Sequence, residues 1–194
     1  MSRLTHRFTH LTLSFALTAL VALGTALPAF ADDSVLLSIG AGGRSASVAD
    51  MALDTVPVQY AHTAQTRTGT MTLTADDSTG SALGWKVNVS ASDFVFTDSA
   101  TDRHWDIGAA NFSITAANAP AMTAGQAIDA TNGPKVPSDF SSGSLESAHK
   151  VIQANADYGK GTYTQDLDVS LNIPADSRAG AYAATLTVTI AAAP

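Results

Sequence analysis

The sequence predicts an all-β protein whose main domain is an antiparallel β-sandwich, immunoglobulin-like or jelly-roll-like. Short runs in which apolar and polar residues alternate recur along the chain, and a period of two is typical of half-buried strands. Gly, Pro, Asn and Asp interrupt these runs at fairly regular spacing, as turns between strands do. No window carries the 3.6-residue period of an amphipathic helix. These observations favour two sheets that bury their apolar faces against each other.

Residues 1–31 have the composition of a secretory signal peptide rather than of a folded element. Arg3 and Arg7 form a positive start, and Leu11 to Leu27 is apolar apart from Thr, Ser and Gly. Residues 29–31, Ala-Phe-Ala, form a small-x-small cleavage site. A retained membrane anchor is the alternative, but the apolar run is shorter than the ~20 residues that span a bilayer. We therefore expect a secreted protein with no membrane span after cleavage.

The expected mature chain, residues 32–194, forms a single acidic domain without cysteine. The whole chain has 10 Lys and Arg, 17 Asp and Glu and no Cys. The signal peptide removes two Arg and no acid, which leaves eight basic residues and a formal charge of −9. Such a protein is a poor candidate for binding nucleic acid or anionic lipid. Without disulfides, an exported domain depends on its hydrophobic core, and a chain of this length buries about 70% of its unfolded surface.

Alternation places strands along the chain before the C-terminal stretch. In one of these runs Trp85, Val87 and Val89 share the apolar face, and Phe94 and Phe96 return to the core after the next turn. The expected strands are residues 35–39, 54–59 (at an edge, because Pro57 cannot donate to a ladder), 68–75, 84–90, 105–107, 111–115, 126–130 within irregular loops from 116 to 146, and 147–156.

The last stretch, residues 161–194, contains the two clearest strands. Leu167 to Ile173 alternates apolar and polar residues, and Pro174 ends the run because proline has no N–H to donate. After a turn rich in Asp, Ser and Gly, Tyr182 to Ile190 alternates again. We expect these two strands to pair antiparallel across a tight corner, in a sheet with one face exposed to water, and to close the fold.

Asp98, Asp102 and Asp106, with His104 nearby, form an acidic cluster on an expected loop. Carboxylates in such a loop could hold calcium. Their spacing is not that of an EF-hand, and no glycine stands where that loop must turn. A solvated turn is therefore the favoured interpretation.

No catalytic or metal-binding motif is present. The histidines that follow the signal peptide, His62, His104 and His149, are far apart and have no Cys partner. There is no Gly-x-Ser-x-Gly elbow of a hydrolase. Glu146 is the only glutamate, so nothing singles out a carboxylate pair for glycoside hydrolysis. We expect a non-enzymatic protein and assign it no cofactor and no metal ligand.

Three aromatic residues are the candidate binding residues. Trp85 could stack on a sugar ring, although its parity with Val87 and Val89 favours a place in the core. Trp105 lies between two polar neighbours and is the better candidate for an exposed stacking surface. Tyr182 follows a turn and could bind a ligand, but we prefer a tyrosine corner, in which the hydroxyl bonds an upstream backbone group.

Two segments carry a resemblance to the WxL domain family. Residues 85–87, Trp-Lys-Val, resemble that family's proximal motif. Val87 replaces the motif's Leu, and Val188 replaces a second Trp in the distal motif. The distal motif, Tyr-x-x-x-Leu-Thr-Trp-x-Leu-x-x-Ala-Pro, is otherwise matched in spacing by Tyr182, Leu186, Thr187, Ile190, Ala193 and Pro194.

The resemblance implies a surface protein of Gram-positive bacteria with an all-β fold. Its members are held non-covalently on the cell wall, on peptidoglycan or another wall glycan, and sometimes act with other surface proteins. A structural or interaction module on the wall is therefore the first hypothesis. The alternatives are a subunit of a surface assembly that uses exposed strand edges and a secreted hydrolase, for which the sequence offers no motif.

Overall fold

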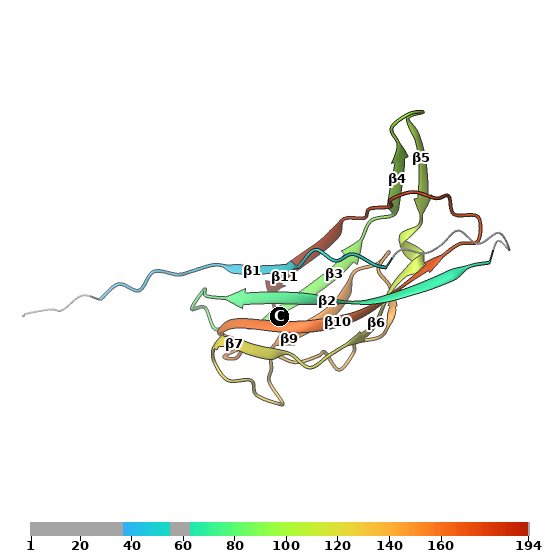
Figure 1. The fold of residues 1–194 in the computed structure, drawn as a ribbon. Coiled ribbons are helices and arrows are strands. Elements are labelled where there is room, and N and C mark those ends of the chain that lie inside the picture. The colour runs from blue at the N-terminus through green and yellow to red at the C-terminus, as the bar shows by residue number, and fades with distance from the viewer. Residues whose placement is uncertain (1–36, 55–62, 194) are drawn as a thin grey trace, which may run out of the picture. The chain divides into compact units, whose positions relative to one another are not determined.

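Two antiparallel sheets face each other across one hydrophobic core (Figure 1). The structure is a computed structural model that describes residues 37–54 and 63–193. Residues from Ile39 onward form one compact unit, to which the following description applies. Its strands are β1 (Arg44–Val48), β2 (Gln65–Asp77), β3 (Trp85–Ala91), β4 (Phe94–Asp98), β5 (Arg103–Ile107), β6 (Phe112–Ala117), β7 (Ala121–Gly125), β8 (Gly143–Ser144), β9 (His149–Ala154), β10 (Gly161–Ile173) and β11 (Leu186–Ala192).

The larger sheet has the strand order β1-β2-β10-β6-β8, and β7 also pairs with β10. Strands β2 and β10 are each 13 residues long and pair along their whole length. The other side of β10 is shared, because β7 pairs with its first half and β6 with its second half. The period of two is strict in β10, whose buried face carries Tyr163, Gln165, Leu167, Val169 and Leu171.

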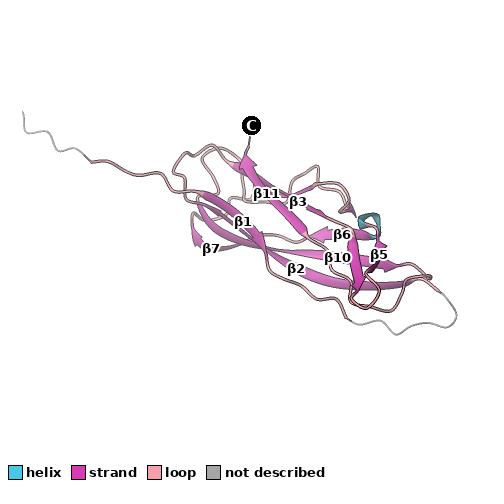
Figure 2. Ribbon diagram, turned by 90° about the horizontal axis from the view of Figure 1, so that it is seen from above, coloured by secondary structure: helices cyan, strands magenta, loops and turns pink. Residues whose placement is uncertain are grey.

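The smaller sheet has the order β11-β3-β9 and covers the core from the other side. Figure 2 shows β3 and β11 running at an angle to β2. Trp85, Val87 and Val89 of β3 are fully buried, as their alternation predicts. The indole N–H of Trp85 donates to the carbonyl of Gly159 at 2.8 Å, so its one polar group is satisfied inside the core.

The β4–β5 hairpin extends away from the two sheets in Figure 1. Phe94, at its base, packs against the core and meets Phe112 edge-to-face, with 5.1 Å between ring centroids. Phe96, which we expected in the core, instead lies opposite Trp105 within the hairpin. The only described helix is one 3₁₀ turn, η1 (Ala109–Asn111). Accordingly, the described residues include no helix of the length and apolar character needed to cross a membrane.

The expected pairing of the last two strands is wrong. Strand β10 lies in the centre of the larger sheet, whereas β11 is an edge strand of the smaller sheet. The connection after Pro174 crosses from one sheet to the other, so the two apolar faces meet across the core. Alternation tells which side chains face the core, but it does not tell to which sheet a strand belongs.

Two other expected strands fall differently. Residues 126–130 do not form a strand, and β7 lies just before them at 121–125. All five residues of β7 are exposed, so no burial pattern marks this strand in the sequence. The expected strand 35–39 is not one over its described part, 37–39, whereas β1 follows the glycines after it. The strand 54–59, apart from Asp54, and the signal peptide lie outside the described residues.

Candidate functional site

A cavity of about 970 Å³ lies between the described residues at the hairpin end of the sandwich. Its walls come from the start of β2, the end of β10, the crossing connection to β11, and the base of the hairpin. The apolar part of the lining comprises Leu53, Phe94, Phe112, Leu171, Ile173 and Leu186. A large apolar hollow with a few polar groups at its rim is the usual form of a ligand site.

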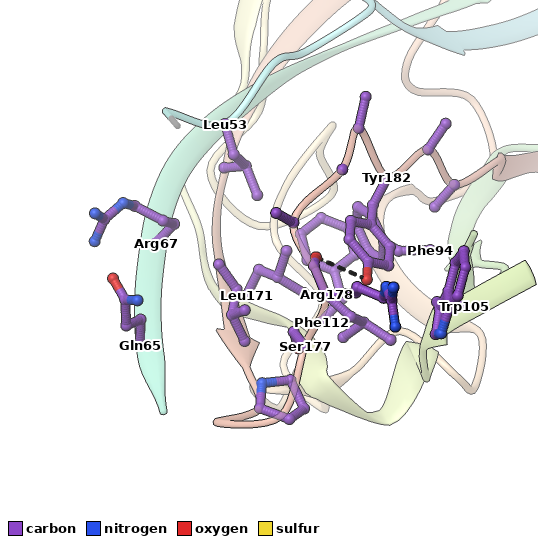
Figure 3. Close-up of a pocket in the computed structure, with 18 of the residues that line it drawn as sticks. Leu53, Gln65, Arg67, Phe94, Trp105, Phe112, Leu171, Ser177, Arg178 and Tyr182 are labelled. Atoms are coloured by element: carbon purple, nitrogen blue, oxygen red, sulfur yellow. Dashed lines mark hydrogen bonds between the residues drawn. The ribbon is translucent and has the colours of Figure 1, made fainter. Parts of the chain in front are cut away.

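An aromatic and cationic cluster forms one side of the cavity mouth (Figure 3). We call Phe96, Trp105, Arg178 and Tyr182 the Trp105 cluster, of which all but Phe96 line the cavity. Phe96 stacks on Trp105, with 5.6 Å between ring centroids and 23° between ring planes. Phe96 also contacts Tyr182 at 5.7 Å, and the guanidinium carbon of Arg178 lies 4.6 Å from the Trp105 ring centroid. A cation over an indole at an exposed site contributes about 0.5–1 kcal/mol.

Backbone pairing places Phe96 and Trp105 side by side. They are opposite residues of the β4–β5 ladder, so both side chains leave the same face of the hairpin. Asp98 orders the hairpin turn, because its carboxylate accepts hydrogen bonds from the Ala100 N–H at 2.9 Å and the Thr101 hydroxyl at 2.8 Å. These bonds, the one from Ala100 first, hold the pKa of Asp98 below its usual value.

The crossing connection is fixed against the hairpin by main-chain and side-chain bonds. Val95 and Ala183 exchange two backbone hydrogen bonds, at 2.8 and 3.0 Å. The Tyr182 hydroxyl donates to the carbonyl of Arg178 at 3.1 Å, which confirms the expected bond from the tyrosine to an upstream backbone group. Gly180 has no side chain, and a Cβ there would stand 2.5 Å from the Phe96 ring. The connection therefore lies closely against the aromatic side chains.

The structure separates the three candidate binding residues. Trp105 and Tyr182 lie together at the cavity, whereas Trp85 is fully buried, with an exposed fraction of 0%. A ligand at the surface cannot stack on Trp85, so only its role in the core is retained. Sequence reasoning missed Phe96 and Arg178. Phe96 could have been identified by treating residues 99–102 as a hairpin turn, which pairs Phe96 with Trp105. Nothing in the sequence places Arg178 over an indole.

The acidic cluster and the histidines take structural positions where they are described. His104 bonds the Thr97 hydroxyl across the hairpin at 3.0 Å, and His149 bonds the Ser144 carbonyl at 2.8 Å. Within residues 37–54 and 63–193, no group of three His, Asp or Glu side chains could hold a metal ion. His62 lies outside the described residues.

The two segments that resemble the WxL motifs are neighbouring strands. In the ladder of β3 and β11, Trp85 lies opposite Ala192 and Val87 opposite Ile190. Val188 lies opposite Val89 and packs, partly buried, against the core. The departure from the family pattern at Val188 is thus at a packing position in this chain, and Val188 is not among the residues that line the cavity.

Comparisons with known proteins agree with these motifs. Neither the curated proteins nor the solved structures include a match to the chain. The sequence model of the WxL domain, described as a surface cell-wall-binding domain, matches residues 45–194, which include both sheets and the cavity. WxL is a family of binding domains rather than of enzymes, and it locates its members at the cell wall. The chain therefore belongs to the WxL domain family of cell-wall-binding surface proteins.

Proposed function

We propose that this protein is secreted by a Gram-positive bacterium and binds peptidoglycan non-covalently through the cavity and the Trp105 cluster. The observation that supports this proposal is the arrangement at the cavity mouth. An indole edge, a guanidinium and a tyrosine stand beside an apolar hollow, in a chain of a wall-binding family. The hollow suits the methyl-rich parts of a wall fragment, and the rim supplies hydrogen bonds.

Apolar contact and hydrogen bonding, rather than long-range charge, dominate the proposed contact. The expected mature chain carries a net charge of −9, so it has no overall attraction to an anionic polymer. Binding should therefore persist when the salt concentration is raised from 0.1 to 1 M, over which the Debye length falls from about 10 to about 3 Å. A steep loss of binding over this range would count against the proposal.

The test is co-sedimentation of the purified protein with insoluble Gram-positive peptidoglycan. Trp105→Ala should weaken binding by about tenfold or more, as loss of a central aromatic anchor does. Tyr158→Ala, a half-buried aromatic that does not line the cavity, is the matched control and should bind as the wild type does. If Trp105→Ala is folded and binds as the wild type, the proposed site is wrong.

A second candidate function is assembly with other surface proteins through β7. We expected the two long final strands to lend or accept a strand. One of them, β10, is paired on both sides and therefore has no free edge for a partner. Strand β7 pairs only with β10 among the described strands, and Met122 within it is 46% exposed. An exposed edge of this kind can accept a strand from a partner.

Sedimentation velocity distinguishes this second function. If β7 mediates self-association, the wild type sediments as an oligomer and Met122→Lys, which places a charge on the edge, sediments as a monomer. If the wild type is monomeric, binds peptidoglycan and co-purifies with no other protein, the assembly function is rejected and wall binding is the remaining candidate.

A further inference from the structure

Arg178 lines the cavity and forms no ion pair with a carboxylate of the described residues. The ion pairs of the described residues are Arg44 with Asp77, at 3.2 Å, and Lys150 with Asp139, at 2.9 Å. Neither involves Arg178, whose side chain is exposed and lines the cavity. In an acidic protein, a free arginine that is held in one position is available to an anionic group of a ligand.

The cation–π contact with Trp105 holds the Arg178 guanidinium over the indole ring. The guanidinium carbon lies 4.6 Å from the indole centroid, which brings the planar group over the ring. The N–H donors of arginine point outward in that plane, in a fork that matches the two oxygens of a carboxylate. Arg178 donates no side-chain hydrogen bond to any residue in the described ranges, so those donors remain available.

The nearby acids do not occupy this fork. Asp98 is close enough to Arg178 for a weak electrostatic effect, but its oxygens accept hydrogen bonds from Ala100 and Thr101 in the hairpin turn. Asp176 also lines the cavity, and it lies farther than 4 Å from the charged nitrogens of Arg178. The Arg178 backbone is held as well, because its carbonyl accepts the Tyr182 hydroxyl. The side chain is therefore positioned from two sides.

We infer that Arg178 binds a free carboxylate of the peptidoglycan stem peptide, an inference that rests on the proposed function. A carboxylate accepts two parallel hydrogen bonds from a guanidinium, which gives direction as well as charge. A phosphate of a wall polymer could bind the same fork. The apolar wall beside it, with Leu53, Phe94 and Leu171, favours the methyl groups of a peptide over a polyol phosphate chain.

The experiment measures the Kd of two soluble muropeptides by calorimetry, one with a free C-terminal carboxylate and one with that group as a carboxamide. The wild type should bind the free acid about tenfold or more tightly, because hydrogen bonds to charged groups contribute that much. Arg178→Gln should lose this preference, and Arg178→Lys should keep only part of it, since lysine lacks the fork. Arg103→Gln, which removes an exposed charge of the β4–β5 hairpin outside the cavity, is the control and should keep the preference.

The comparison of the two ligands on the wild type does not depend on the folding of any variant. Equal affinity of the wild type for acid and carboxamide overturns the inference, and so does a preference that survives in Arg178→Gln. If the wild type binds cell walls that retain teichoic acid but not walls from which it has been removed, the inference is also overturned, and the ligand of Arg178 is a phosphate. In the first two cases the muropeptide still binds and the proposed function stands. Wild-type protein that binds neither muropeptides nor whole peptidoglycan would instead overturn the proposed function itself.

Discussion

Trp85 is buried on every side, and its indole N–H has a backbone partner. Trp85→Ala should destabilise the protein by about 3–5 kcal/mol, because it leaves a large cavity and removes the hydrogen bond to the Gly159 carbonyl. Urea unfolding measures this change. Trp105→Ala, in the half-buried hairpin position, is the comparison and should cost less than about 2 kcal/mol. Equal costs at the two positions would contradict the different burial of the two indoles.

Asp98 carries a prediction about pH. Its pKa lies below the usual value of 3.8 because the Ala100 N–H and the Thr101 hydroxyl stabilise the ionised carboxylate. A lowered folded pKa means that the contribution to stability is present above about pH 4 and is lost as the pH falls through the folded pKa. An NMR titration of the side-chain carboxyl carbon should show this low pKa. A titration midpoint of Asp98 at or above 3.8 would mean that the hydrogen bonds from Ala100 and Thr101 do not stabilise the ionised carboxylate.

Residue roles that depend on local pattern could be predicted from the sequence. The parity of Trp85 with two valines predicted its burial, and the turn before Tyr182 predicted the bond of its hydroxyl to the backbone. The position of Arg178 could not be predicted. It depends on a connection between two sheets that meets a hairpin formed much earlier in the chain, and no local pattern records such a contact.

At the scale of elements, the β4–β5 hairpin and the crossing connection support each other through Gly180. Gly180→Ala would place a Cβ 2.5 Å from the Phe96 ring, so the ring or the connection must move. We expect a loss of about 1–3 kcal/mol and a changed Trp105 fluorescence, because the aromatic side chains are packed against one another.

Gly43→Ala is the matched control for this substitution. A Cβ at Gly43 meets nothing within 4 Å, so this variant should differ from the wild type by no more than about 1 kcal/mol and should keep its fluorescence. If the two alanine variants behave alike in urea unfolding and in fluorescence, the close packing at Gly180 has no energetic consequence.

The longest strands, each with a fully buried face, were found from the sequence, and the exposed strand β7 was not. The 13-residue strands β2 and β10 contain the predicted runs 68–75 and 167–173, because alternation is strongest where one face is fully buried. Strand β7 is exposed throughout and left no such signal. Alternation also does not identify the neighbouring strand in the sheet. For this reason β11 was expected to pair with β10, whereas it pairs with β3.

For the whole molecule, the prediction concerns export. If residues 1–31 are a signal peptide, the protein recovered from the cell surface begins at Asp32, and N-terminal sequencing should show this residue. Replacing Ala31 with a bulky residue such as Tyr should block cleavage and retain the precursor, because the cleavage site requires small side chains. Recovery of the surface protein with Met1 intact would show instead that the N-terminal segment is kept.

The central claim is that a wall fragment binds at Trp105 and not at Trp85. The chain has two tryptophans, so a ¹H–¹⁵N spectrum shows two indole N–H signals that can be followed during titration with a soluble muropeptide. We predict that the Trp105 signal shifts in proportion to binding, while the Trp85 signal stays in place, because that N–H is buried and bonded to Gly159. A bound muropeptide that leaves the Trp105 signal unchanged, or that shifts Trp85 instead, would contradict this assignment of the site.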